Sequence, residues 1–247
     1  MAEKVIVTRD LTRKFGTFTA VDSISFEVEA GEIFGFLGAN GAGKSTAMKM
    51  LIGLLRPSSG EATVAGLDVY RQSEEIKHNI GYMSQRFSLY EDLTVKENIA
   101  FFGGIYGIRG KDLRQKTEEL LARLQLENKA NTLVKALPLG WKQKLAFSVA
   151  VLHEPRIVFL DEPTGGVDPI TRRQFWDMIY EVAERQITVF VTTHYMDEAE
   201  YCDRVSMMVD GKIEALNSPE GLRQDFGVEN MNDVFLYLAR TAKRKGD

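Results

Sequence analysis

Three short stretches of the chain are mostly apolar, and each has the length of a single strand. They are residues 33–37 (Ile-Phe-Gly-Phe-Leu), 157–160 (Ile-Val-Phe-Leu) and 188–193 (Thr-Val-Phe-Val-Thr-Thr). Runs of roughly four to eight such residues suit the strands of a parallel sheet, because helices bury both of its faces. The pattern therefore predicts an α/β fold built on a mostly parallel sheet.

A second pattern, in which apolar and polar positions alternate, is typical of strands with one face in water. Residues 24–28 alternate in this way, and residues 63–67 are expected to continue the same antiparallel part after a turn at residues 57–60. Asp210 and Gly211 lie between two further strand-like segments and predict a hairpin. We expect an antiparallel part beside the parallel sheet.

Helical spacing dominates the middle of the chain, from about residue 86 to residue 152. The apolar faces of two predicted helices there are Leu113, Leu120, Leu121 and Leu124, and Leu145, Val149 and Leu152. Farther along, Asp168 as an N-cap and Pro169 in the first turn predict a helix that ends near Ala183.

Residues 38–46 complete the phosphate-loop pattern Gly-x-x-x-x-Gly-Lys-Ser/Thr between a predicted strand and a predicted helix. Glycines let the backbone N–H groups surround a polyphosphate, and the helix N-terminus adds a positive dipole end. A Gly-rich turn that only packs a helix on a sheet is the alternative, and the complete pattern argues against it. The candidate nucleotide-binding residues are Gly38, Ala39, Asn40, Gly41, Ala42, Gly43, Lys44, Ser45 and Thr46. We expect Lys44 to reach the β- and γ-phosphates, Ser45 to reach Mg²⁺ and Thr46 to reach the α-phosphate.

Two carboxylates follow the apolar run at residues 157–160. Asp161 is expected at the C-terminal end of a buried strand, where open α/β sheets place their ligands. A carboxylate there can hold Mg²⁺, and the next one, Glu162, can take the proton of an attacking water. An acidic pair at a strand end is often only solvated. Combined with a phosphate loop, it predicts a hydrolysis site.

The order of these features resembles the nucleotide-binding domain of an ABC (ATP-binding cassette) transporter over nearly the whole chain. Four further residues match the family's order: Gln85 the Q-loop, Asp168 the D-loop, His194 the switch histidine and Phe15 the aromatic that stacks on adenine. Taken singly, each of these residues has an ordinary structural explanation. Six features in the family's order make coincidence negligible.

The resemblance implies the fold of a P-loop NTPase, with a mostly parallel sheet core, an antiparallel β subdomain and an inserted helical subdomain. It implies one domain over residues 1–247, with the core at about 1–85 and 153–220, the helical subdomain at about 86–152 and a C-terminal helix at about 221–240. The cofactors implied are ATP and Mg²⁺, with the metal organised by Ser45, Gln85 and Asp161. The catalytic residues implied are Lys44, Gln85, Glu162 as general base and His194 as sensor of the γ-phosphate.

The family's signature loop, typically Leu-Ser-Gly-Gly-Gln, is altered here to Leu-Pro-Leu-Gly-Trp at residues 137–141. In the family this loop caps the γ-phosphate held by the opposite subunit. Pro138 has neither a hydroxyl nor a backbone N–H, whereas Leu139 and Gly140 keep their N–H groups before a helix. The loop resembles those of exporter-type ATPases related to antibiotic-resistance transporters, which favours a tolerated variant. A partner subunit with a better signature stays open.

Composition narrows the class of protein. The net charge of −4 argues against a general nucleic-acid-binding protein. Cys202 is the only cysteine, so no internal disulfide can form. The sequence has no run of about 18 apolar residues, and its N-terminus lacks the apolar segment of a signal peptide. We expect a place on the cytoplasmic side of the cell membrane, through a separate membrane subunit.

The resemblance also implies partners. We expect a separate transmembrane permease subunit that contacts residues 85–106, and a second ATPase subunit in a head-to-tail dimer coupled through Asp168, as a homodimer rather than a heterodimer. The predicted function is ATP hydrolysis that drives transport, with export favoured. The alternatives are a soluble ABC-type assembly or scaffold factor and a binding-only regulatory subunit. The intact Lys44, Asp161, Glu162 and His194 argue against the last.

Overall fold

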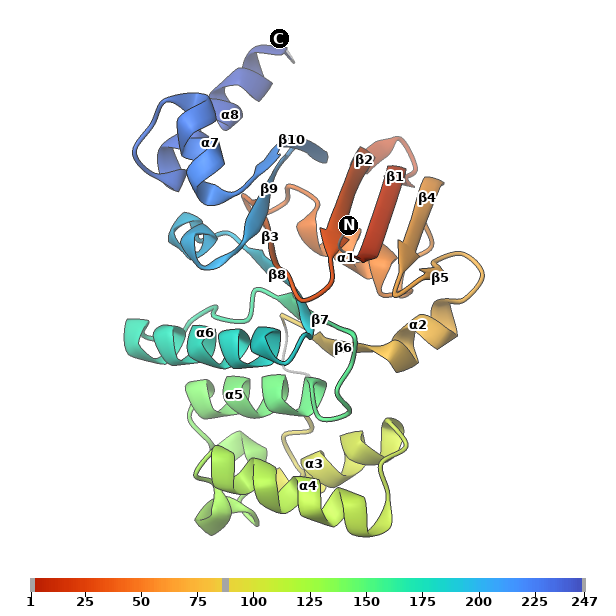
Figure 1. Cartoon of the computed structure of the whole chain (residues 1–247), viewed down its shortest axis with the longest axis vertical. Coiled ribbons are helices and arrows are strands. Elements are labelled where there is room, and N and C mark those ends of the chain that lie inside the picture. Colours follow the sequence, from red (N-terminus) through yellow and green to blue (C-terminus); the bar gives the residue numbers. More distant parts are fainter. Residues whose placement is uncertain (1–2, 86–88, 246–247) are drawn as a thin grey trace.

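The computed structural model describes residues 3–85 and 89–245, and within them two sheets organise the chain (Figure 1). The larger sheet has six strands in the order β10-β9-β3-β8-β7-β6. The smaller sheet has four strands in the order β2-β1-β4-β5. The predicted fold class is confirmed.

The six-stranded sheet contains the three predicted apolar strands side by side. Its parallel strands are β3 (Ile33–Gly38), β6 (Ile80–Met83), β7 (Ile157–Asp161), β8 (Thr188–Thr193) and β9 (Arg204–Val209). Every residue of β3, β7 and β8 is buried, as their apolar sequences predict. At the edge, β10 (Lys212–Asn217) pairs antiparallel with β9 through the predicted hairpin at Asp210 and Gly211.

The four-stranded sheet is antiparallel throughout and consists of β1 (Lys4–Phe15), β2 (Phe18–Glu29), β4 (Ser59–Val64) and β5 (Leu67–Asp68). The predicted continuation at residues 63–67 differs in detail, because a tight turn interrupts it. Ala65 and Gly66 both have positive φ, at 53° and 81°. Two such residues in succession form the turn that suits a two-residue hairpin, so the segment joins two strands.

Helices cover both ends of the molecule. The helices that precede β7 in the sequence are α1 (Lys44–Leu51), α2 (Ser73–Asn79), α3 (Val95–Ile105), α4 (Gly110–Arg123) and α5 (Leu139–Ala150). The later ones are α6 (Pro169–Glu184), α7 (Pro219–Phe226) and α8 (Met231–Lys245). Three short 3₁₀ turns complete the described elements: η1 (Glu127–Lys129), η2 (Val134–Ala136) and η3 (Met196–Tyr201). Figure 1 shows α3, α4 and α5 together at one end and α7 and α8 at the other.

The C-terminal region differs from the single predicted helix at about residues 221–240. Two helices lie there, and the chain turns between them at Gly227, whose φ is 64°. A glycine in this left-handed conformation ends a helix without the strain that a side chain would add. By contrast, α6 begins at Pro169 with Asp168 as its N-cap and ends one residue beyond the prediction.

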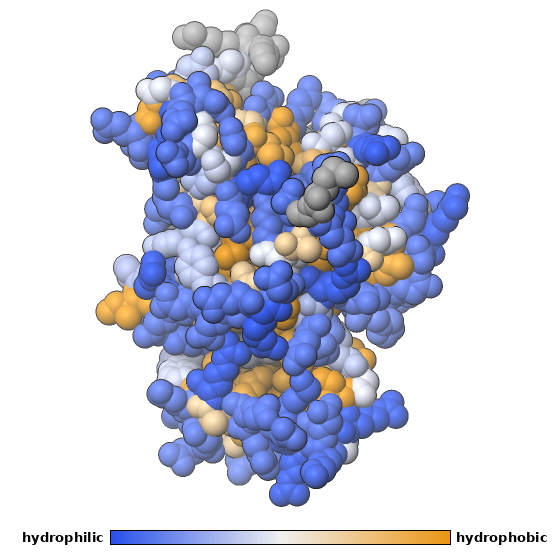
Figure 2. Space-filling model, viewed as in Figure 1, coloured by the Kyte–Doolittle hydropathy of each residue, from blue (hydrophilic) through white to orange (hydrophobic). Residues whose placement is uncertain are grey.

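Two apolar cores lie on opposite faces of the larger sheet. Phe34 and Phe36 of β3 pack against Phe26 of β2, with ring centroids 5.5 and 5.6 Å apart, and so join the two sheets. Leu37 of the same strand belongs to the core beneath the helices. The face in Figure 2 is mostly hydrophilic, with apolar side chains in small groups. The side chains of β3 therefore belong alternately to the two cores, and the phosphate loop begins at the end of this strand.

Candidate nucleotide-binding site

The phosphate loop leaves β3 and enters α1 at Lys44. Two of its glycines are sterically required. A Cβ on Gly38 would lie 2.3 Å from the Met208 carbonyl oxygen, and one on Gly43 would lie 2.4 Å from the Ala20 carbonyl oxygen. Gly43 also has a φ of 106°, which L side chains rarely adopt. The loop thus packs directly against the backbone of β2 and β9.

The Lys44 side chain lies inside this loop and is only 4% exposed. Its Nζ donates to the carbonyl oxygens of Gly38 at 2.8 Å and Ala39 at 3.1 Å, and it lies 3.5 Å from Glu162 Oε1. Burial lowers the pKa of Lys44, and the charges of Glu162 and Asp161 oppose that change. Phosphate oxygens would offer this ammonium group stronger, charged acceptors than two carbonyls do.

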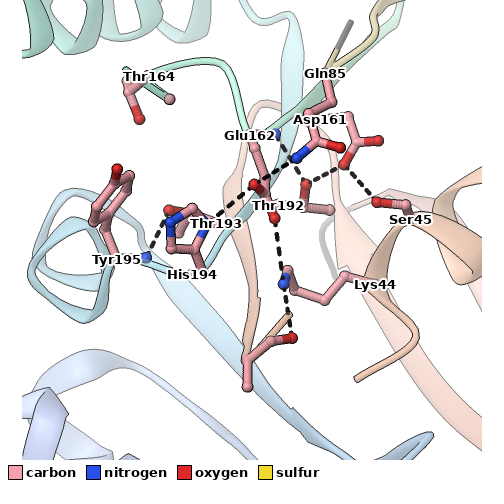
Figure 3. Close-up of polar contacts among 12 residues, drawn as sticks. Lys44, Ser45, Gln85, Asp161, Glu162, Thr164, Thr192, Thr193, His194 and Tyr195 are labelled. Atoms are coloured by element: carbon pink, nitrogen blue, oxygen red, sulfur yellow. Dashed lines mark hydrogen bonds and ion pairs between the residues drawn. The ribbon is translucent and has the colours of Figure 1, made fainter. Parts of the chain in front are cut away.

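Ser45 and Asp161 meet at the base of the loop. Ser45 Oγ donates to Asp161 Oδ1 at 3.0 Å, and Thr192 Oγ1 of β8 donates to the same oxygen at 2.7 Å (Figure 3). A hydroxyl beside a carboxylate is the hard oxygen chemistry that Mg²⁺ prefers. Within residues 3–85 and 89–245, no cluster of three or more His, Cys, Asp or Glu residues could hold a metal without a substrate. This donor set therefore fits a metal that phosphate oxygens help to bind.

Glu162 is the point at which the predicted catalytic residues converge. Its carboxylate accepts from Gln85 Nε2 at 2.9 Å and lies 3.0 Å from His194 Nδ1, in addition to its ion pair with Lys44 (Figure 3). The backbone is held as well, since Glu162 N donates to Thr192 O and Thr192 Oγ1, both at 3.1 Å. Its φ of 50° turns the chain sharply after β7 and aims the side chain at the loop.

An open cavity of about 380 Å³ lies over the phosphate loop. Phe15 and Phe18 line it from the β1–β2 hairpin, opposite Lys44, Ser45, Gln85 and Glu162. Phe15 is 47% exposed, and the Arg13 guanidinium lies 4.5 Å from its ring centroid. An exposed ring at the mouth of a phosphate cavity is suited to stack on a base. Phe18, at 63% exposure, is a lining residue that the sequence reasoning missed.

The predicted contacts to a second subunit lie elsewhere. Leu139, Gly140 and Asp168 are not among the residues that line this cavity. Leu139 begins α5, is 44% exposed and lines a neighbouring cavity of about 270 Å³ together with Gln85 and Glu162. Asp168 caps α6 through bonds to Ile170 N and Thr171 N, both at 3.0 Å. A hydrogen bond from the Thr171 hydroxyl, followed by these backbone bonds, lowers the pKa of Asp168.

Thr192 is the second residue that the sequence reasoning missed. It lies within a strand-like run of apolar and threonine residues, and its hydroxyl is fully buried between Asp161 and Glu162 N. A threonine in an otherwise apolar run was the available signal. Its role depends on β8 pairing directly with β7, which local sequence does not specify.

A family model described as "ABC transporter" matches residues 21–165, more than half of the chain. The chain belongs to this family. The sequence of this ABC protein is 50% identical over 221 residues to the "Probable multidrug ABC transporter ATP-binding protein YbhF" of Escherichia coli (strain K12). That match covers 90% of the chain but only 38% of the relative.

A second relative matches this chain over most of the length of both proteins. It is the "Linearmycin resistance ATP-binding protein LnrL" of Bacillus subtilis (strain 168), which is 32% identical over 98% of this chain and 81% of its own length. A solved "Structure of ATP binding subunit of ABC transporter" superposes with a TM-score of 0.86 at 26% identity, over 95% of this chain and 99% of that one. No helix in the described ranges combines the length and hydropathy needed to cross a bilayer.

Proposed function

We propose that this ABC protein binds and hydrolyses ATP and that its hydrolysis drives export by a separate membrane subunit. The observation that carries the proposal is the convergence of Lys44, Gln85 and His194 on Glu162, beside the Ser45–Asp161 pair. The names of the relatives, a multidrug transporter protein and a linearmycin resistance protein, support outward transport.

In the proposed reaction each residue has a separate task. Lys44 exchanges the Gly38 and Ala39 carbonyls for the β- and γ-phosphates of ATP. Glu162 takes a proton from the water whose oxygen attacks the γ-phosphorus, and ADP is the leaving group. His194 holds the γ-phosphate once its contact with Glu162 has opened. Gln85, which donates to the same Glu162 oxygen that His194 contacts, orients the attacking water.

Mg²⁺ would be held by Ser45 and Asp161, with Gln85 as a further proposed ligand, and it would neutralise charge between the β- and γ-phosphates. Thr192 keeps Asp161 Oδ1 in place through its 2.7 Å hydrogen bond. These residues thereby fix the carboxylate before a substrate arrives, which reduces the reorganisation needed on binding.

A head-to-tail homodimer completes the proposed site, with the N-terminus of α5 from one subunit facing the ATP of the other. The first three N–H groups of α5 have no partner within the helix, which is where an anion binds best. Asp168 would couple the two sites. A solved dimeric ATP-binding cassette bound to ADP and Pi, 25% identical to this chain with a TM-score of 0.78, supports this arrangement.

The permease subunit is proposed to dock on residues 85–106, which include α3. Tyr90, Phe101 and Ile105 are exposed there by 51%, 42% and 51%, and the Tyr90 and Phe101 rings are 4.8 Å apart. Such a group of exposed apolar side chains favours a protein partner. Residues 86–88, which belong to the predicted contact region, lie outside the described residues.

Replacing Lys44 by alanine tests the proposed function directly. We expect ATP affinity to fall by roughly tenfold or more, because charge-assisted hydrogen bonds to phosphate are lost. Isothermal titration calorimetry of the purified chain measures this, together with phosphate release. Lys49→Ala is the matched control, since Lys49 lies on the exposed side of the same helix. An affinity in Lys44→Ala equal to that of the control would contradict nucleotide binding at this loop.

Removing the Phe15 ring tests the base-stacking role. Phe15→Ala should weaken ATP binding by about 1–2 kcal/mol, the magnitude of one aromatic stacking contact, whereas Phe15→Tyr should be mild. Phe101 is a phenylalanine of similar exposure on α3, and Phe101→Ala should leave the affinity of the isolated chain unchanged. Equal affinities for Phe15→Ala and Phe101→Ala would rule out stacking by Phe15.

A further inference from the structure

Two separate contacts join the loop after β7 to the segment after β8. The first, between Glu162 and His194, lies in the site already described. The second is buried beside it, where Thr164 Oγ1 donates to Glu198 Oε1 at 2.5 Å. Both side chains have 0% exposure. The same two segments that carry the proposed general base and the switch histidine are thus connected twice.

Glu198 is an unusual residue to bury for packing alone. Its Oε2 has no hydrogen-bond partner in the described residues, and its nearest cation is Arg172 of α6, whose Nε lies 3.6 Å from Oε1. Burying a carboxyl group in this way is unfavourable, and an apolar residue of similar volume would stabilise a core at least as well. Its burial therefore indicates that Glu198 helps to fix the position of the segment after β8.

Glu198 is connected to His194 along two paths. Its backbone N donates to Tyr195 O at 3.2 Å. Its partner Arg172 lies 4.2 Å from the centroid of the Tyr195 ring, which in turn lies 4.2 Å from the His194 ring. A displacement of Glu198 would therefore be passed to the residue directly after the switch histidine.

Thr164 is connected to Glu162 in the same way. Gly165 N donates to Glu162 O at 3.2 Å, so Thr164 lies inside a tight turn that begins at the general base. The Gly165 carbonyl accepts from Gln143 of α5 at 3.0 Å. The turn is therefore held from three sides, by β8, by α5 and by Glu198.

We propose that Thr164 and Glu198 are positioning residues that keep Glu162 and His194 in register during hydrolysis, an inference that rests on the proposed function. For the reaction, the Glu162 carboxylate must release His194 so that water and the γ-phosphate can lie between them. The Thr164–Glu198 bond lies outside that space and stays closed. It maintains the spacing of the two segments at the moment when their direct contact is broken.

Thr164→Val tests this, because valine keeps the shape and removes the hydroxyl. We expect kcat to fall roughly tenfold, with KM within about twofold, since positioning by pre-set hydrogen bonds acts on the reacting geometry. Thr164→Ser should restore kcat. Thr117→Val is the matched control: Thr117 is also buried and loses a 2.7 Å bond to Leu113 O in α4. A kcat for Thr164→Val equal to that of Thr117→Val, or a loss confined to KM, would overturn the proposal.

Hydrogen exchange of the nucleotide-free protein provides a readout independent of hydrolysis. In Thr164→Val, amides of residues 195–202 should exchange faster, although the substitution lies about thirty residues away along the chain. Changes restricted to residues 162–168 would refute the coupling even if kcat had fallen. If the wild-type chain released no phosphate, the proposed function would fail, whereas this experiment would still decide whether the two segments are coupled.

Discussion

Replacing Glu162 by glutamine is expected to lower ATP turnover by about 100-fold or more while ATP affinity stays within a few-fold. The amide keeps the size of the side chain and can still accept from Gln85, whose Nε2 lies 2.9 Å from Oε2. It cannot take a proton from water. Phosphate release at saturating ATP and calorimetric titration separate the two effects, because one reports chemistry and the other binding.

The control for this experiment is Glu181→Gln, which removes an exposed carboxylate that pairs with Arg123. Exposed pairs contribute little to stability, so this variant should retain normal turnover. Turnover in Glu162→Gln equal to that in Glu181→Gln would remove Glu162 from the role of general base. The Gln variant should also accumulate the ATP-bound dimer, which makes it the background for the second experiment.

Leu139→Asp in this background is expected to abolish ATP-driven dimerisation and to leave ATP binding by the monomer intact. The new carboxylate would face the γ-phosphate of the opposite subunit, and two like charges in a partly desolvated interface repel. In the monomer, an acidic residue in the first turn of α5 interacts favourably with the helix dipole. If Leu139→Asp fails to dimerise, unfolding of α5 would therefore not be the cause. Light scattering with and without ATP measures the outcome.

Gly140, whose N–H group is also expected to face the opposite phosphate, is a less suitable position for this test. A Cβ at Gly140 would lie 2.6 Å from Thr171 Cγ2 of α6, so any side chain there would disturb the packing of two helices. Leu54→Asp is the matched control for Leu139→Asp, because Leu54 is 56% exposed and lines neither cavity of the site. A Leu139→Asp dimer as stable as that of the control would show that this loop does not cap the opposite phosphate, and a heterodimer whose partner supplies the working signature loop would then be the alternative.

Local patterns were sufficient to predict which segments meet at this candidate site. The phosphate loop and Glu162 come at the ends of buried apolar strands, and Asp161 is the last residue of one of them; parallel strands bring those ends to one edge. The convergence of Gln85 and His194 on Glu162 is a different matter. It depends on the strand order β3-β8-β7-β6, which places β8 between strands that are distant in sequence.

Two residues that sequence reasoning missed, Thr192 and Glu198, act through such non-local neighbours. Thr192 looks like an ordinary strand residue until β8 pairs with β7. No sequence pattern assigned a role to Glu198, which lies in η3 and is buried against Thr164. Backbone strain was equally hidden, since nothing in the local sequence predicts the positive φ of Glu162. Periodicity specifies which face of an element is buried but not which element lies opposite.

The phosphate loop contacts both sheets, because Gly38 packs on a backbone carbonyl of β9 and Gly43 packs on one of β2. Met208 belongs to the six-stranded sheet and Ala20 to the four-stranded one, so neither sheet can slide past the other without deforming the loop between them. The affinity of that loop for a polyphosphate would therefore depend on the alignment of both sheets. A nucleotide bound by this loop would therefore lie at a junction of the two sheets, where its binding depends on how the sheets are placed relative to one another.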